Sequence, residues 1–189
     1  WAALMSDYFI KQYPDCDIQN FNSGIGGTGS ELGAYRCEND VLAHKPDLVF
    51  YEFAVNDFWE GHDLIKNSCD AILHKIRTAL PYCDIVFLYT TTKTVSEHLA
   101  SGGIYASRTI HTATAYRYGD IVQIDIGEVL RNRFLTCGND YSTLLPDTTH
   151  PNDEGHALYF ETIRRKLEDT LRNAEDVTAP IAHKLPPVL

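Results

Sequence analysis

The sequence predicts an α/β fold of three layers, α/β/α, in which helices cover both faces of a parallel sheet. Two observations predict it. Apolar runs of strand length alternate along the chain with segments in which apolar residues recur every three or four positions. Strands joined by helices form right-handed crossovers, so they pair in parallel and need cover on both faces. With 189 residues, 44% of them hydrophobic, the chain has the size and composition of one globular domain.

The predicted elements alternate from the N-terminus onwards. Strands are predicted at Ile18 to Asn22, Asp47 to Ala54, Asp84 to Thr90 and Asp120 to Ile126. Helices are predicted over residues 30–43, 64–80, 104–118 and 152–173. The second of these helices has the clearest period, and Pro81 marks its end because proline cannot continue a helix. We therefore expect one domain over residues 1–173, followed by a proline-containing tail, 174–189, that is either a strap on the domain or a linker.

Charge and cysteine usage narrow the possible partners and the compartment. Twenty-six acidic residues against sixteen Lys and Arg give a formal charge of −10, which repels nucleic acid and anionic membrane surfaces. No apolar run approaches the roughly 20 residues of a membrane span. Five widely spaced cysteines without a C-x-x-C pair indicate reduced thiols rather than a disulfide framework or a zinc cluster. We therefore expect a cytoplasmic protein, with a signal peptide removed before Trp1 as the alternative.

A glycine-rich loop, Asn22 to Ser30, follows the first predicted strand and precedes a helix. Its glycines let the backbone approach a ligand and turn N–H groups towards an anion. Two other interpretations stay open: a tight turn with Ser30 as the N-cap of the helix, and a dinucleotide site. The dinucleotide site rests on a G-x-G-x-x-G pattern in the loop and on Glu52 at the end of the next strand. The polar residues of the preceding strand disfavour it.

Asn56 and Asp57 follow the most apolar strand, at the sheet edge where ligands bind in open parallel α/β folds. Residues of these types at such a place can be helix caps. The functional interpretation is that the side-chain amide of Asn56 donates a hydrogen bond to a developing oxyanion. A neutral donor suits that task because it stabilises charge without changing its own protonation state.

A third loop carries Asp147-Thr148-Thr149-His150-Pro151 within an irregular stretch. Pro151 favours an extended backbone at His150, so the imidazole projects from a stiff loop. Asp147 lies three residues earlier and can hold Nδ1–H, which leaves Nε2 free as a base. The alternative is an Asp-initiated turn followed by an incidental surface histidine.

Taken together, the three loops resemble the SGNH or GDSL hydrolase superfamily, serine esterases with a flavodoxin-like parallel sheet. Residues 22–27 (N-x-G-x-x-G) resemble its second block, residues 54–57 (A-V-N-D) its G-x-N-D block, and residues 147–151 its D-x-x-H-P block. The order and spacing of the blocks agree over most of the chain. The resemblance therefore implies the SGNH hydrolase fold.

The resemblance also implies roles for four residues. The Gly27 N–H and the Asn56 amide would donate to the oxyanion. His150 would be the general base, oriented by Asp147. The implied reaction is hydrolysis of small or medium acyl esters, acetyl esters of carbohydrates among them, with no cofactor and no metal.

Two positions depart from the family pattern. Ala54 stands where the block usually has glycine, which is a small change. The first block, a G-x-S that carries the nucleophile after the first strand, is absent. Trp1 resembles the tryptophan in the helix that follows that serine. We therefore expect that residues upstream of Trp1, or another chain, supply the first strand and the serine.

Several alternatives to this interpretation stay open. The residues considered as substitutes for the serine are Ser23, Thr28, Ser30 and Cys137. None of them is predicted at a strand-to-helix elbow beside His150. The alternative function from another class is a binding module that holds an acylated sugar or lipid without cleaving it. A nucleotide-binding enzyme is a weaker alternative.

Two regions are candidates for determining substrate specificity. The sequence predicts no oligomeric state. The first region follows Asn56 directly and consists of Phe58, Trp59, Glu60 and His62. The second is the loop from Thr91 to Gly103, for which a long solvated connection is the alternative.

Overall fold

A three-stranded parallel sheet lies at the centre of the computed structural model, in the order β1-β2-β3. Its strands are β1 (Leu48–Tyr51), β2 (Asp84–Tyr89) and β3 (Ile121–Asp125). The structure describes residues 1–136, 138, 140–172 and 181–186. The last three predicted strands are confirmed, each somewhat shorter than predicted.

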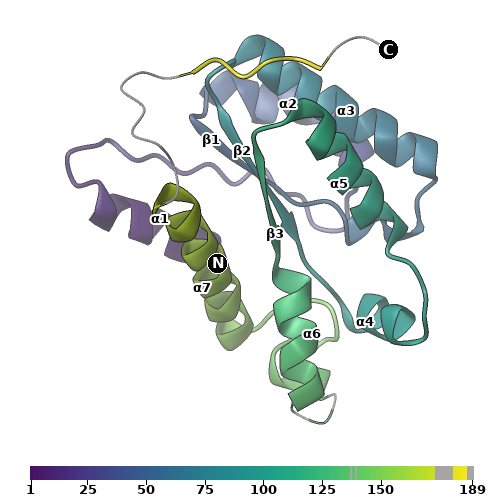
Figure 1. Cartoon of the computed structure of the whole chain (residues 1–189). Helices are drawn as coiled ribbons and strands as arrows, with labels where there is room; N and C mark the ends of the chain where they lie inside the picture. The colour runs from purple at the N-terminus through teal and green to yellow at the C-terminus, as the bar shows by residue number, and fades with distance from the viewer. Residues whose placement is uncertain (137, 139, 173–180, 187–189) are drawn as a thin grey trace.

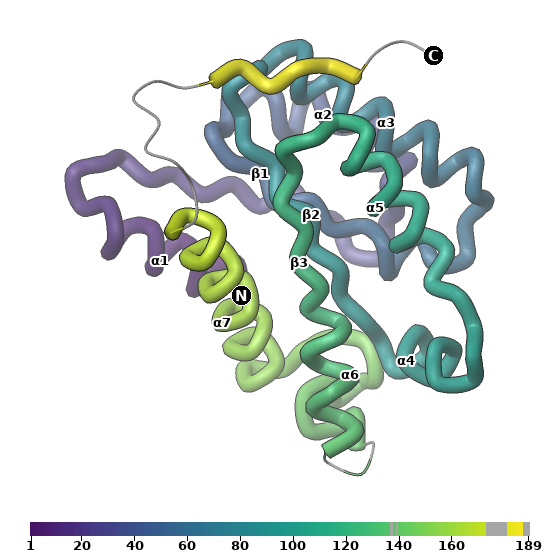
Figure 2. The backbone as a smooth tube through the Cα atoms, in the orientation of Figure 1, coloured from purple at the N-terminus to yellow at the C-terminus, as the bar shows by residue number. Residues whose placement is uncertain are grey.

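Helices cover both faces of the sheet (Figure 1). In chain order the helices and 3₁₀ turns are α1 (Ala2–Gln12), α2 (Ser30–Asp40), η1 (Leu42–His44), η2 (Asn56–Trp59), α3 (His62–Ala79), α4 (Lys93–Ala100), α5 (Ala106–Tyr118), α6 (Ile126–Thr136), η3 (Tyr141–Thr143) and α7 (Asp153–Arg172). On one face lie α2, α3 and α5, and on the other lie α1, α6 and α7, with α1 packed along α7 (Figure 2). The predicted three-layer α/β/α fold is confirmed.

The alternation of side chains along β2 explains why both faces need cover. Ile85, Phe87 and Tyr89 point into the core formed with α3 and α5. Val86 and Leu88 point into the core formed with α1, α6 and α7. All five side chains are buried, as expected for the central strand of a parallel sheet.

The first predicted strand is wrong, because residues 18–22 form no strand. Phe21 and Asn22 are exposed, and the polar residues of this segment offer no apolar face to the core. A strand also needs a partner. Within the described part of the chain, β1 pairs on one side alone, with β2. A polar segment with no ladder to join stays extended and solvated.

The structure contains the predicted helices and further helices that were not predicted. The predicted helices correspond to α2, α3, α5 and α7, and α3 ends before Pro81 as expected. The periodicity analysis did not identify α1, α4 or α6. The loop from Thr91 to Gly103 holds α4, whose Val95 is buried, so it is not merely a solvated connection.

The tail is described in part, and residues 174–180 and 187–189 lie outside the described residues. Within residues 181–186, the His183 N–H donates to the Pro81 carbonyl at 2.8 Å. The His183 ring contacts Asp84 at 3.2 Å, at the amino end of β2.

The cysteines that the structure describes are free thiols, as expected: Cys16, Cys37, Cys69 and Cys83. No described helix has the length and apolar character that a membrane span requires.

Candidate active site

The turn after β1 places Asn56 against the glycine-rich loop. Asn56 begins η2, and its Nδ2 donates to the Thr28 carbonyl at 2.9 Å. Thr28 closes the loop on itself by donating its hydroxyl to the Ile25 carbonyl at 2.8 Å. Gly27 has a φ of 72°, in the left-handed region that favours glycine, and its N–H bonds to no described residue. The structure therefore brings Asn56 beside the loop that carries Gly27.

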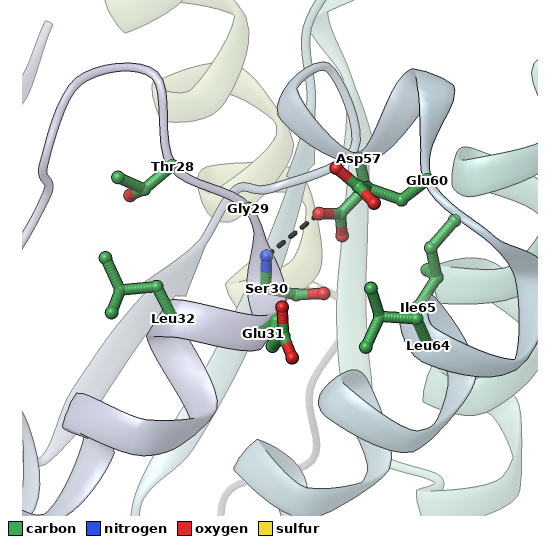
Figure 3. Close-up of a pocket in the computed structure, with 9 residues that line it drawn as sticks. All are labelled: Thr28, Gly29, Ser30, Glu31, Leu32, Asp57, Glu60, Leu64 and Ile65. Atoms are coloured by element: carbon green, nitrogen blue, oxygen red, sulfur yellow. Dashed lines mark hydrogen bonds between the residues drawn. The ribbon is translucent and has the colours of Figure 1, made fainter.

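Asp57 turns away from Asn56 into the interior, where it is 1% exposed. Its Oδ1 accepts the Ser30 N–H at 2.9 Å (Figure 3). Its Oδ2 lies 2.8 Å from Nε2 of His111, whose Nδ1 lies 2.9 Å from the Tyr51 hydroxyl. Burial opposes ionisation of Asp57, but the hydrogen bonds from His111 and Ser30 outweigh it and lower the pKa of this carboxyl.

The carboxylate of Asp57 also caps α2, so the interpretation of Ser30 as the N-cap is wrong. Gly29 occupies that position and has no side chain to accept a bond. A Cβ on Gly29 would collide with Oδ1 of Asp57, so only glycine allows the two loops to approach this closely. A carboxylate at this helix end also interacts favourably with the helix dipole.

Asp147 and His150 form a pair on the loop before α7. Oδ2 of Asp147 lies 2.7 Å from Nδ1 of His150, and Oδ1 accepts the N–H groups of His150 at 2.6 Å and Thr149 at 2.9 Å. These bonds, that of the His150 N–H above all, lower the pKa of Asp147 far below its usual range. The side chains of His150 and Asp147 are 76% and 58% exposed. Nε2 of His150 bonds to nothing within the described residues.

Contacts on both sides hold this loop in place. The Thr148 carbonyl accepts the N–H of Lys93 at 2.9 Å, which ties the loop to the first turn of α4. Asn152 caps α7 by accepting the Gly155 N–H at 2.9 Å. Its Nδ2 donates to the Thr143 carbonyl at 3.0 Å.

The carboxyl group of Glu52 joins the ends of β1 and β2. It accepts the Thr90 hydroxyl at 3.1 Å and the N–H of Val55, in the turn that leads to η2. Burial raises the pKa of Glu52 to about 7. On the other side of the turn, Ser107 donates to the Ala54 carbonyl at 2.7 Å. Glu52 is thus engaged inside the protein, which disagrees with the ribose contact of the dinucleotide interpretation.

The described hydroxyls considered as substitutes for the serine are all engaged elsewhere. Ser23 and Thr28 donate to backbone carbonyls, and Ser30 is buried beside Asp57. None of them bonds to His150, and Cys137 lies outside the described residues. The described residues therefore bring together His150 and Asp147 without placing a hydroxyl on Nε2 of His150.

A pocket of about 220 Å³ lies beside the glycine loop (Figure 3). It is lined by residues 28–32, Asp57, Glu60, Leu64 and Ile65. The side chain of Leu32 borders it on one side, and Leu64 and Ile65 border it on the other. The pocket adjoins Asn56 through η2, which contributes Asp57 and is followed directly by Glu60.

Residues 1–158 match the GDSL-like Lipase/Acylhydrolase family. The chain belongs to this family. The resemblance drawn from the three loops is thereby confirmed, although the match by itself assigns no role to any residue.

Similar proteins within the family include carbohydrate esterases. A segment of 65 residues, 34% of this chain, is 38% identical to an acetylxylan esterase from Geobacillus stearothermophilus and spans 29% of that protein. A two-domain esterase active on acetylated mannans, co-crystallised with mannopentaose, superposes with a TM-score of 0.79 at 25% identity, covering 96% of this chain and 46% of that one. The chain thus matches less than half the length of either protein.

Another solved structure is similar in fold over most of its length. The crystal structure of an acetylxylan esterase from Geobacillus stearothermophilus superposes with a TM-score of 0.67 at 18% identity. The superposition covers 88% of this chain and 79% of that chain.

The sequence analysis did not predict the buried hydrogen bonds that join Asp57, His111 and Tyr51 next to Asn56. His111 was one of several histidines without a metal-binding pattern, and nothing paired it with Asp57. A signal was present in α5, where Ser107, His111 and Thr114 recur at helical spacing on the buried side. A buried histidine requires a partner, and a carboxylate at the end of a neighbouring strand is a natural one.

Proposed function

We propose that the chain carries the base and the oxyanion-binding groups of a serine-type ester hydrolase. The observation that carries the proposal is the Asp147–His150 pair, whose free Nε2 lies beyond the carboxyl ends of the strands, as Asn56 does. The proposed substrates are small or medium acyl esters, acetyl esters of carbohydrates in particular. Similarity to esterases named for acetylxylan and acetylated mannans supports this substrate class.

The hydrogen bonds of Asp147 support the role of His150 as a general base. The pKa of Asp147 is depressed, so the carboxylate is charged at neutral pH and accepts Nδ1–H. A proton on Nδ1 leaves the lone pair of the imidazole on Nε2. After His150 takes a proton, the carboxylate also stabilises the imidazolium.

The Asn56 amide has the donors that an oxyanion site needs. Its NH₂ group carries two hydrogens, and one is committed to the Thr28 carbonyl. The second hydrogen has no acceptor among the described residues. The N–H of Gly27, which bonds to no described residue, is the second proposed donor. Loss of one such donor typically lowers turnover by about 10²–10³-fold.

The proposed reaction proceeds in two displacements. A serine Oγ loses its proton to Nε2 of His150 and forms a bond to the ester carbonyl carbon, while Asn56 and Gly27 hold the carbonyl oxygen as an oxyanion. The C–O bond to the alcohol breaks, and the alcohol leaves with the proton from His150. Water then gives a proton to His150 and releases the acid from the serine.

The serine of this proposal is outside the described residues. Its assignment rests on the unengaged Nε2 of His150 and on the edge of β1 that no described strand pairs. The test is fluorophosphonate labelling of the native protein, followed by peptide mapping. We expect one adduct, on a serine that is missing from residues 1–189. We expect no adduct in the His150→Ala variant. An adduct on a serine within 1–189 would overturn the assignment of the nucleophile.

A binding module is the second candidate, and the same observation favours it. A base with no hydroxyl beside it is also what a non-catalytic relative of this fold would retain. A protein that binds acetylated oligosaccharide but gives neither adduct nor acetate release would establish this candidate and exclude the hydrolase.

A further inference from the structure

We propose that Trp59 is the surface on which a sugar ring of the substrate stacks. This inference deepens the proposed function and rests on it for the place of the ester carbonyl. Trp59 ends η2 and is 78% exposed, among the most exposed large apolar side chains that the structure describes. An indole gains much of its binding energy from burying its apolar faces, so a tryptophan this exposed offers a surface for a ligand.

The geometry of η2 places Trp59 on the same side as Asn56. A 3₁₀ helix has three residues per turn, so the side chains at positions i and i+3 project in the same direction. One turn of 3₁₀ helix rises about 6 Å, which is on the scale of one sugar ring. A ring on Trp59 would thus lie one position from a carbonyl at Asn56.

The indole is supported from below by aromatic contacts. The rings of Phe58 and Trp59 meet edge to face, with centroids 4.6 Å apart. Phe58 in turn packs against His98 at 5.3 Å and Tyr105 at 5.6 Å. Tyr105 is buried, so this stack connects Trp59 to the core. A ring that is already held in place loses little conformational entropy when a ligand covers it.

The surroundings of Trp59 favour a sugar over a fatty chain. The faces of an indole are electron-rich, and they attract the C–H groups that line one face of a pyranose. The hydroxyls around that sugar ring need acceptors, and carboxylates supply them. Glu31 and Glu60 line the adjoining pocket and are exposed. A fatty acyl chain would leave these carboxylates desolvated and unpaired.

Calorimetric titration with unacetylated oligosaccharides tests the proposal without requiring turnover. Xylopentaose and mannopentaose are the probes. Trp59→Ala is expected to weaken the binding of at least one of them about tenfold, and Trp59→Phe to weaken it less. The matched control is Tyr116→Ala on α5, which removes a ring that is 75% exposed and is expected to leave the Kd unchanged. Equal binding by Trp59→Ala and the parent protein would overturn the proposal.

Fluorescence locates the bound sugar independently. Residues 1–189 carry two tryptophans, Trp1 and Trp59, so an emission change that persists in Trp1→Phe and disappears in Trp59→Phe comes from Trp59. A shift of that emission to shorter wavelength on addition of the binding sugar is expected. Binding without a shift would place the sugar elsewhere and overturn the proposal, as would no binding of either probe. Failure of fluorophosphonate labelling alongside Trp59-dependent binding would instead reject the hydrolase and leave the stacking surface in place.

Discussion

The two halves of the candidate site are built in opposite ways. Behind Asn56, the Asp57 carboxylate is buried and bonds to residues 27 and 54 positions away, Ser30 and His111. The pair of Asp147 and His150 is exposed, and its bonds span no more than three positions. One half therefore depends on side-chain bonds to distant parts of the fold, while the side-chain bonds of the other stay within one turn, which a backbone bond from Lys93 to Thr148 ties to α4. Changes in the first half should cost stability, and changes in the second should cost chemistry alone.

The largest effect is expected on turnover, at His150. His150→Ala should lower hydrolysis of p-nitrophenyl acetate by about 10⁴-fold, because the variant lacks the proposed general base. The free energy of unfolding should change by less than about 0.5 kcal/mol, since the side chain is mostly exposed. Steady-state kinetics and urea denaturation measure the two. His74→Ala, which removes another exposed histidine, is the control. A marked loss of stability in His150→Ala would contradict the separation of the two halves.

The next largest effect is expected on stability, at Asp57. Asp57→Ala should lower the free energy of unfolding by about 4 kcal/mol, because His111 and the Ser30 N–H lose a buried partner. Asp57→Asn keeps the shape and one acceptor, and it should lose less. Urea denaturation followed by circular dichroism measures both. Asp147→Ala is the matched control in the exposed half, and an equal loss in Asp57→Ala and Asp147→Ala would refute the comparison.

A pH-dependent effect is expected at Glu52. Its pKa in the folded protein is about 7, against 4.5 for an ordinary glutamate, so folding disfavours the ionised form. The contribution of protonated Glu52 to the free energy of unfolding is fully present below pH 4.5. It is lost as the pH rises through 7, by about 3 kcal/mol in total. Glu52→Gln should therefore gain stability relative to the parent protein as the pH rises from 4.5 to 8.

Denaturation series at several pH values check this expectation. Glu60→Gln, which removes an exposed carboxylate from the same region, is the matched control. A stability difference between Glu52→Gln and the parent that stays constant from pH 4.5 to 8 would show that Glu52 titrates normally.

The smallest effect is expected on stability, at Gly29 in the glycine-rich loop. Gly29→Ala should lower the free energy of unfolding by about 2 kcal/mol, because the new Cβ would displace the carboxylate of Asp57. Gly26→Ala adds the same group three residues earlier, where nothing lies within 4 Å, and should be close to neutral. Thermal unfolding of the two variants checks the pair. Similar melting temperatures would mean that the Asp57 cap contributes little.

The parts predicted from sequence were those that short stretches of chain determine. The period of α3 and the stop at Pro81 are local, and so is the turn that joins Asp147 to His150. The strand predicted at Ile18 to Asn22 was wrong, because pairing depends on a neighbour rather than on propensity. The bond between Asp57 and His111 was not predictable for the same reason, since it joins residues 54 positions apart. The nucleophile and the proposed roles of Gly27 and Asn56 stay predictions.

The Asp57 carboxylate also determines how freely Asn56 can move. It connects the turn after β1 to the first residue of α2 and to the middle of α5, so Asn56 cannot shift unless two helices shift with it. A donor held in this way is preorganised: its dipole points in a fixed direction before any ester arrives, and it needs no rearrangement when charge develops. A displacement of α5 would by the same connection reach the proposed oxyanion site.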